Sequence, residues 1–366
     1  MTKRKLKIFS FFSGSGFLDL GFEKNGFEIV FVNEFHPAFM KAYKYSRKKM
    51  KIKEPEYGYF NGDINEFLLN RKNELYQWMQ DARKDGSLVG FIGGPPCPDF
   101  SIAGKNKGRD GDNGKLSLSY TNLIINMKPD FFLFENVKGL WRTARHRAFY
   151  EELKQNISCA DYVMTDRLTN ALEYGAPQDR DRILLFGVQK SVLKQNNIEE
   201  FPWERYQKFT LEEVKSFPWP DVEPFFKDSR TNCPEGIPRE LTVEYWFEKN
   251  DVEHHPNGKD HFIPRGGLAR MQTISEGDVS KSYKRLHRWR YSPTVAYGNN
   301  EVHLHPYKER RLSAAEAMSL QSLPKEFELP EEMTLTDKFK TIGNGVPYVL
   351  ASGIAKTIFD YMENDY

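Results

Sequence analysis

Residues 7–17 read KIFSFFSGSGF, an apolar run that leads into a glycine-rich turn. The run Lys7–Phe12 has the residue types of a buried β-strand, and the residues after the turn predict a helix to about Asn25. Gly14 and Gly16 let a ligand approach the backbone of the turn, and the N-terminus of the following helix favours a negative group. The stretch therefore predicts the first strand and helix of an α/β sheet, with a candidate binding site between them.

Short apolar runs alternate with helical stretches through the first half of the chain. We expect further strands at Glu28–Asn33, Leu88–Ile92, Phe131–Phe134 and Ile183–Val188. Such alternation is typical of a mainly parallel sheet covered by helices. Residues 191–310 are rich in proline and aromatic residues and have weak periodicity, which predicts a loop-rich region.

Regular patterning returns near the C-terminus. Ser313 and Glu316 form a capping-box pair, which opens a helix to about Leu320. A last helix at roughly Val349–Met362 follows a turn at Gly343–Pro347. The C-terminal helix is expected to pack with the α/β sheet.

The composition is that of a globular protein in a reducing compartment. The 366 residues (42.8 kDa) are 39% hydrophobic and 28% charged, and no stretch reaches the roughly 18 apolar residues of a membrane helix. Three widely spaced cysteines, Cys97, Cys159 and Cys233, form no disulfide framework, so we expect a cytoplasmic protein. The net charge of +2 argues neither for nor against a nucleic-acid partner.

Two acidic residues stand at the ends of predicted strands beside the glycine turn. Glu34 lies 20 residues after Gly14, where a carboxylate can grip ribose hydroxyls, and Asp63 could accept from an adenine amino group. The dinucleotide fingerprint requires a third glycine where this chain has Asp19, which disfavours pyrophosphate binding. A glycine turn with two acids is also ordinary in α/β sheets, so the residues alone leave a nucleoside cofactor and a purely structural role open.

The strand at Leu88–Ile92 runs into the loop GGPPCPDFS, residues 93–101. Three prolines around Cys97 fix the backbone just beyond a strand end, where α/β sheets place active sites. A rigidly held thiol suits covalent catalysis better than a role as a small buried hydrophobe. The basic, glycine-rich residues 104–115 that follow could form a lid over a polyanion, or a surface loop.

Two further motifs flank predicted strands. Glu135-Asn136-Val137 places a carboxyl at the end of the Phe131–Phe134 strand, a neighbour of the cysteine strand. Gln178, Arg180 and Arg182 alternate ahead of the last predicted strand, which puts them on one face. A solvated edge strand would explain the same charges.

Five elements in this order resemble the DNA (cytosine-5) methyltransferases, of the bacterial restriction–modification type. They are Phe12-Ser13-Gly14-Ser15-Gly16, Pro95-Pro96-Cys97, Glu135-Asn136-Val137, Gln178-x-Arg180-x-Arg182 and Gly343-Asn344-Gly345-Val346. The likeness extends over the chain except for about residues 191–290, and Arg311-Leu312-Ser313 resembles a further motif of the family. The family implies a Rossmann-like, S-adenosylmethionine-dependent α/β fold with a smaller, loop-rich target-recognition domain.

The resemblance implies roles for the motif residues. S-adenosylmethionine would be the cofactor and S-adenosylhomocysteine the product. The implied cofactor-binding residues are Phe12, Gly14, Gly16, Glu34, Phe35, Asp63, Ile64, Pro95, Asn344 and Val346. Cys97 would attack carbon 6 of a flipped-out cytosine, Glu135 would meet its N3 and amino edge, and Arg180 and Arg182 would support that carboxyl and the base's carbonyl oxygen.

The chain departs from the family at Pro98, where glutamine is usual. The position has no catalytic role in the family scheme, so activity is still expected, but proline removes an N–H and a polar side chain from the loop. Amino-methyltransferases are disfavoured, because they need a polar residue and an aromatic one where this chain has Gly94 and Cys97. A tRNA cytosine-5 methyltransferase and a catalytically inactive DNA-binding homologue remain as alternatives.

A basic run predicts the DNA contacts. Residues 279–300 contain no acid, and their lysines and arginines alternate with aromatic residues, a pattern that suits phosphate contact and base reading. The predicted DNA-binding residues are Ser101, Lys105, Gln178, Lys284, Arg285, Arg288, Arg290 and Thr294. Cys233 and the nearby histidines fit no zinc-finger spacing, so no metal site is expected.

These observations together predict an organisation and a set of partners. Residues 1–190, completed by about 335–366, would form the catalytic and cofactor-binding domain, 191–310 the target-recognition domain, and 311–334 a connecting hinge. Double-stranded DNA is the expected partner of a monomeric protein without membrane association. A cognate restriction endonuclease encoded nearby would be a functional partner, not a physical one.

Overall fold

The computed structural model describes residues 5–96, 112–193, 198, 201–263, 271–280, 282–295, 297 and 302–364. Its centre is a seven-stranded sheet of order β3-β2-β1-β4-β5-β7-β6. The strands are β1 (Leu6–Phe11), β2 (Phe27–Glu34), β3 (Tyr59–Asn61), β4 (Leu88–Gly93), β5 (Phe131–Val137), β6 (Tyr162–Asn170) and β7 (Asp181–Gln189). Strands β1 to β5 pair in parallel, whereas β7 runs antiparallel to both β5 and β6.

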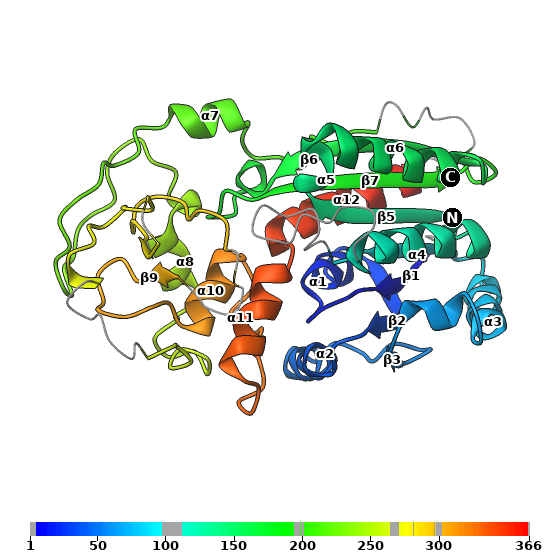
Figure 1. Ribbon diagram of the computed structural model, residues 1–366, viewed down its shortest axis with the longest axis horizontal. Helices are drawn as coiled ribbons and strands as arrows, with labels where there is room; N and C mark the ends of the chain where they lie inside the picture. Colours follow the sequence, from blue (N-terminus) through cyan, green and yellow to red (C-terminus); the bar gives the residue numbers. More distant parts are fainter. Residues whose placement is uncertain are drawn as a thin grey trace.

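Helices cover both faces of the sheet, which confirms the predicted α/β class (Figure 1). Apolar side chains of α1 (Phe17–Glu23), α2 (Pro37–Lys49) and α12 (Tyr348–Asn364) pack on one face. Those of α3 (Lys72–Arg83), α4 (Asp112–Met127) and α6 (Ala144–Ser158) pack on the other. Shorter helical turns are η1 (Ile64–Phe67), α5 (Gly139–Arg142) and η3 (Ala171–Tyr174).

The predicted strands are present, and most are longer than the sequence indicated. β6 was not predicted, because it is an edge strand whose mixed sequence YVMTDRLTN leaves most of its side chains half-buried. The predicted turn at Gly343–Pro347 is partly helical, since α11 (Leu335–Asn344) includes its first two residues. The predicted capping box is confirmed: Ser313 and Glu316 cap α10 (Ala314–Leu320) through reciprocal hydrogen bonds.

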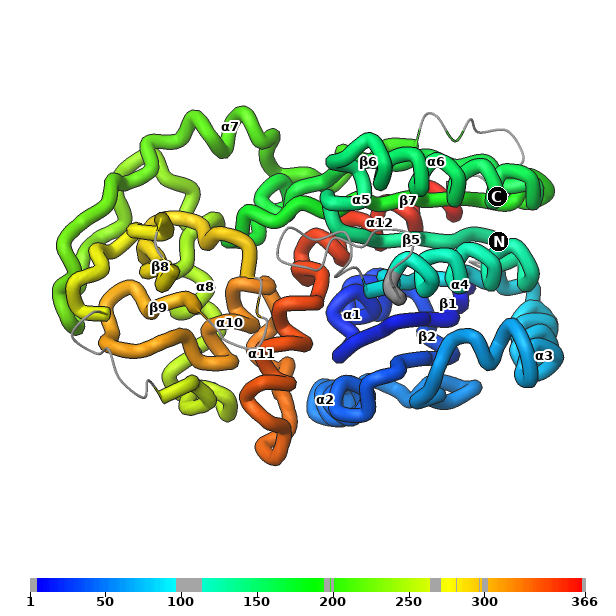
Figure 2. The backbone as a smooth tube through the Cα atoms, viewed as in Figure 1, coloured from blue at the N-terminus to red at the C-terminus, as the bar shows by residue number. Residues whose placement is uncertain are grey.

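A second, loop-rich lobe lies beside the sheet, as the tube in Figure 2 shows most clearly. Its regular elements are few and short: α7 (Leu211–Ser216), η5 (Arg239–Leu241), α8 (Val243–Lys249), β8 (Lys284–Arg285) and β9 (His303–Leu304). One apolar core joins α1 and α2 of the sheet lobe to α8, α10 and α11. The boundaries given above for three functional domains stay a prediction.

The chain enters the second lobe, and first returns from it, at one corner of the sheet lobe. On entering, the N–H groups of Lys208 and Phe209 donate to the carbonyl of Glu173 at 2.8 and 3.1 Å. On leaving, the N–H of Ser292 donates to the carbonyl of Pro177 at 2.8 Å. The described residues contain no helix that is long and apolar enough to span a bilayer.

Candidate functional site

The carboxyl ends of β1, β2, β3, β4 and β5 meet at one edge of the sheet, because these strands are parallel. The order of strands reverses between β1 and β4, which is where open α/β sheets bind ligands. The glycine turn follows β1 and the Pro-Pro loop follows β4. Glu34 and Asp63 follow the neighbouring strands β2 and β3. The structure thus brings both halves of the predicted site to one edge.

The two glycines of the turn face opposite environments. Gly14 has a φ of +56°, and a Cβ added there would meet no atom within 4 Å. Gly16 has a φ of +82°, and a Cβ there would lie 2.5 Å from the ring of Tyr43 and 2.6 Å from Nη1 of Arg47. Only Gly14 therefore leaves open space for a ligand, whereas Gly16 is required by packing within the protein.

Glu34 is held beside the turn by two backbone N–H groups. Its Oε2 accepts from Gly14 at 2.8 Å and its Oε1 from His36 at 2.7 Å. Burial raises the pKa of this carboxyl, against the lowering effect of those hydrogen bonds. The side chain of the next residue, Phe35, is 69% exposed.

The other predicted cofactor residues surround this point. Asp63 is exposed and caps η1, which begins at the buried Ile64. Asn344, the last residue of α11, is exposed, whereas Val346 is 5% exposed and belongs to the core. The hydroxyl groups of Ser15 and Thr341 lie 2.7 Å apart, and this contact joins the glycine turn to α11.

Glu135 and Arg182 form a buried ion pair at the same edge. Oε1 of Glu135, on β5, lies 2.6 Å from Nε of Arg182, on β7, and both side chains are about one-tenth exposed or less. The antiparallel register places Val137 opposite Arg182, so the start of β7 reaches the end of β5. Burial raises the pKa of Glu135, while the charges of Arg182 and Arg180 oppose the rise.

The Pro-Pro loop begins directly against the Glu135 carboxyl. A Cβ added at Gly94 would lie 2.4 Å from Oε2 of Glu135, so a larger residue there would require the carboxyl to move. Pro95 is buried, and its carbonyl oxygen lies 3.5 Å from Nδ2 of Asn136. The predicted nucleophile Cys97 and the DNA-binding candidates Ser101 and Lys105 lie outside the described residues. So do residues 104–111 of the predicted lid, whereas residues 112–115 form the start of α4.

A model of the C-5 cytosine-specific DNA methylase family matches residues 6–360. The chain belongs to this family. It is 58% identical over 366 residues to the Type II methyltransferase M.NmeDI of Neisseria meningitidis serogroup C, covering 100% of this chain and 86% of that protein. It is 30% identical to the Type II methyltransferase M.FnuDI of Fusobacterium nucleatum, covering 96% of this chain and 94% of that protein. The family resemblance drawn from the motifs, including its restriction–modification type, is confirmed.

The fold of this methylase is shared with solved structures. A prophage-encoded protein described as a DNA modification methyltransferase (E. coli) superimposes with a TM-score of 0.67 at 23% identity, covering 97% of this chain and 99% of that one. At that identity the likeness concerns the fold alone. It supports the methyltransferase-type α/β fold expected from the sequence.

Two residues of the Gln-x-Arg-x-Arg motif of the methylase are buried away from the predicted ligands. The guanidinium of Arg180 donates to the carbonyls of Val295 at 3.0 Å and Gly343 at 2.6 Å. Gln178 has no exposed surface, donates to the carbonyl of Leu320 and accepts from the N–H of Val295. The structure therefore corrects the prediction that Gln178 contacts DNA, and it directs Arg180 to backbone carbonyls at the junction of the two lobes.

The basic run of the methylase also divides into two groups. Arg285 has no exposed surface and donates to the carbonyls of Met271, Ile274, His305 and Lys308. Arg288 is 3% exposed and is paired with Glu276 at 2.8 Å. The prediction that these two arginines contact DNA is wrong for this structure, because their guanidinium groups bind partners within the second lobe.

Three other predicted DNA contacts of this run, Lys284, Arg290 and Thr294, are at least partly accessible. Lys284 and Arg290 are half-buried, and Thr294 is exposed, with its hydroxyl donating to the carbonyl of Asp179. Arg290 lies with its guanidinium 5.5 Å from the centre of the Tyr291 ring. A DNA contact by these residues stays a prediction.

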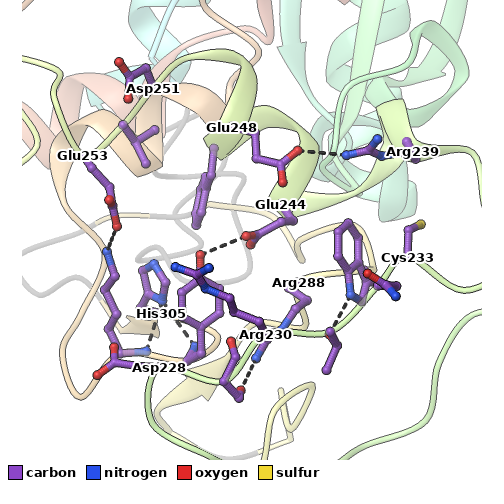
Figure 3. A pocket seen from close by; sticks show the side chains of 18 residues that line it. Asp228, Arg230, Cys233, Arg239, Glu244, Glu248, Asp251, Glu253, Arg288 and His305 are labelled. Carbon is purple, nitrogen blue, oxygen red and sulfur yellow. Dashed lines mark hydrogen bonds and ion pairs between the residues drawn. The ribbon is translucent and has the colours of Figure 1, made fainter.

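A hollow of about 700 Å³ opens in the second lobe (Figure 3). Five carboxylate and four cationic side chains line it, and several are paired, as in Arg239 with Glu248 at 2.8 Å. Tyr307 also donates to Glu244 there, at 2.9 Å. The near-balance of charge does not suit a polyanion, and the hollow contains none of the predicted cofactor residues.

Sequence reasoning missed one buried residue at the cofactor end, Arg47. It lies in the run KAYKYSRKKMKIK, residues 41–53, whose many exposed lysines resemble a solvated helix face. The only signal for its interior position is its spacing of four from Tyr43, which places both on one face of α2.

Proposed function

We propose that this protein transfers a methyl group from S-adenosylmethionine to carbon 5 of cytosine in double-stranded DNA, as the modification enzyme of a restriction–modification system. The observation that carries the proposal is the Glu135–Arg182 pair, buried directly against the loop that continues to Cys97. A carboxyl held in this way has the chemistry needed to meet the N3 edge of a cytosine.

The residues at the turn fit the proposed cofactor. Gly14 faces open space, the carboxylate of Glu34 is fixed beside it, and the exposed ring of Phe35 offers a face for an adenine. Asp63 and Asn344 would hold the adenine edge and close the C-terminal side. When bound, S-adenosylmethionine supplies an electrophilic methyl group.

Cys97 would act as the nucleophile. Carbon 5 of cytosine is unreactive until the Cys97 thiolate adds to carbon 6, which breaks aromaticity and makes carbon 5 enamine-like. After carbon 5 has been methylated, loss of its proton and elimination of the thiolate restore the aromatic ring. The base must leave the duplex for this reaction, at a cost of a few kcal/mol.

Glu135 would supply the proton that this addition needs. Burial raises its pKa, which favours the protonated carboxyl as a donor to N3 of the cytosine. Arg182 fixes Oε1, and its remaining N–H groups would reach the carbonyl oxygen of the base. Arg180 would act indirectly, by holding the backbone carbonyls of Val295 and Gly343.

The recognition lobe would bind the duplex through Lys284, Arg290 and Thr294, together with Ser101 and Lys105 of the Pro-Pro loop region. Residues 1–190 with 335–366 would serve catalysis, 191–310 recognition, and 311–334 the connection between them. We expect a cytoplasmic monomer, with a restriction endonuclease as its functional counterpart.

The test is to give the purified protein radiolabelled S-adenosylmethionine with unmethylated DNA or with bulk tRNA, and to locate the modified base. Label at cytosine carbon 5 in DNA is the expected result, and mapping it would give the recognition sequence. Label only in tRNA would show that the substrate is tRNA and not DNA. Cofactor binding without any transfer would indicate a regulatory homologue and refute the proposed activity.

A further inference from the structure

A cluster of polar side chains lies on the inner side of the glycine turn, opposite the open space at Gly14. Its centre is Arg47 of α2, whose side chain is 2% exposed. Nη1 of Arg47 donates to the carbonyl of Ser15 at 3.2 Å, and Nη2 donates to the carbonyl of Gly16 at 2.6 Å. One guanidinium thus binds two consecutive carbonyls of the turn.

The guanidinium is fixed from its other sides as well. Its Nε donates to the carboxylate of Glu23 at 3.1 and 3.3 Å, and its carbon lies 4.1 Å from the centre of the Tyr43 ring. The hydroxyl of Tyr43 in turn donates to Asp19 at 2.9 Å, and Ser10 donates to the other oxygen of Asp19. Buried ion pairs add little net stability, so a network of this extent is better explained by the geometry that it imposes.

The network fixes the direction of two carbonyl groups in the glycine turn. The carbonyl oxygens of Ser15 and Gly16 are directed at Arg47, and that of Gly16 also accepts from the N–H of Leu20 at 3.0 Å, so their negative ends are removed from the outer side of the turn and Arg47 is the side-chain donor shared by both. The outer side is where a ligand with a carboxylate, such as the methionine end of S-adenosylmethionine, would otherwise meet repulsive oxygens. Gly16 is required by the same arrangement, since any Cβ would collide with Tyr43 and Arg47.

We propose that Arg47 is a positioning residue for cofactor binding, which holds the carbonyls of Ser15 and Gly16 inward and so presets the surface that receives the methionine end of S-adenosylmethionine. The inference rests on the proposed function, because it assumes that cofactor. Arg47 itself does not touch the ligand and acts only through the turn.

The test compares binding of S-adenosylhomocysteine, the stable product, by calorimetry in variants of the full chain. Arg47→Lys keeps a positive charge beside Glu23 but offers one nitrogen where the guanidinium uses three. We expect its Kd to rise about tenfold or more, with a matching rise in the KM for S-adenosylmethionine and less than a threefold change in kcat. The matched control is Arg288→Lys, which disturbs an equally buried ion pair in the other lobe and should leave the Kd within twofold.

The outcomes distinguish failure of the proposed function from failure of the role of Arg47. A wild-type protein that does not bind S-adenosylhomocysteine would overturn the proposed function and this inference with it. Binding by the wild type and equally tight binding by Arg47→Lys would overturn the role of Arg47 alone. An equal loss in Arg288→Lys would do the same, since it would reflect general destabilisation.

Two further measurements cover the case in which Arg47→Lys does not fold. The double variant Arg47→Met with Glu23→Gln removes both members of the ion pair together and should show the same tenfold loss. In the wild-type protein, the amides of residues 15–17 should exchange slowly with solvent before any ligand is added. Fast exchange that becomes slow only with S-adenosylhomocysteine would show that the ligand, not Arg47, orders the turn, and would overturn the proposal.

Discussion

Replacing Gly94 by alanine should impair catalysis by displacing the Glu135 carboxyl. The added Cβ would lie 2.4 Å from Oε2, about 1 Å closer than ordinary van der Waals contact. Glu135 cannot withdraw freely, because its Oε1 is held 2.6 Å from Arg182. A misplacement of about 1 Å at a reacting group costs on the order of a hundredfold in rate, so we expect kcat to fall by about that factor.

The assay is transfer of a radiolabelled methyl group to unmethylated DNA under saturating cofactor. The Kd for S-adenosylhomocysteine should stay within twofold of wild type, since Glu34 and Phe35 are not disturbed. Gly93→Ala is the control at the neighbouring position, because its Cβ would meet the ring of Tyr120 and not Glu135. The reasoning is refuted if Gly94→Ala keeps kcat within threefold of wild type, or if Gly93→Ala lowers it as much.

Five other substitutions test separate parts of the protein. Arg285→Ala should lower the free energy of unfolding by about 3 kcal/mol, measured by denaturant titration, because four carbonyls lose their donor. Arg290→Ala should chiefly weaken the dependence of DNA binding on salt, reducing the slope of log K against log salt concentration by about one. Burial lowers the pKa of His305 to about 3, so its contribution to stability is present above pH 6.5 and is lost as the pH falls. We expect unfolding titrations between pH 7.5 and 5.5 to show a loss of up to about 1.4 kcal/mol per pH unit, and His305→Asn to have a smaller slope; an unchanged slope would contradict this. Cys97→Ser should abolish turnover while DNA and cofactor still bind, and turnover in that variant would exclude the covalent mechanism. Pro98→Gln should keep methyl transfer within about tenfold, since no chemistry is assigned to the side chain.

The sequence predicted the part of the site that depends on strand ends. Glu34 and Glu135 were placed correctly because parallel strands bring their carboxyl ends to one edge, a rule that needs only the position of each strand. Arg182 was placed with Glu135 through the family motif. The antiparallel direction of β7, which brings the beginning of that strand to the same edge, could not be inferred from its residues.

The predictions failed where a charge turned inward. Arg285 and Arg288 belong to a run that looks uniformly cationic, yet their partners are carbonyls and a carboxylate distant in sequence. Arg47 was hidden among lysines for the same reason. Local composition reports the presence of a charge, whereas its direction depends on tertiary partners that no local pattern contains.

The chain passes between the two lobes at the corner formed by Glu173–Asp179, and this bears on how proteins of this family can diverge in sequence. Because the chain enters the second lobe and first returns from it at this corner, residues 210–291 form an excursion that begins and ends at one place on the sheet lobe. An excursion of this kind could be exchanged for another of different length without moving a strand of the sheet. The exchange would have to preserve the contacts of this segment with the later part of the chain. These are the pairing of β8 with β9, the apolar core that α8 shares with α10 and α11, and the hydrogen bonds of Asn250 to Ser319 and to the carbonyl of Leu323. New DNA specificities could thus arise by grafting, while the reaction chemistry is inherited unchanged.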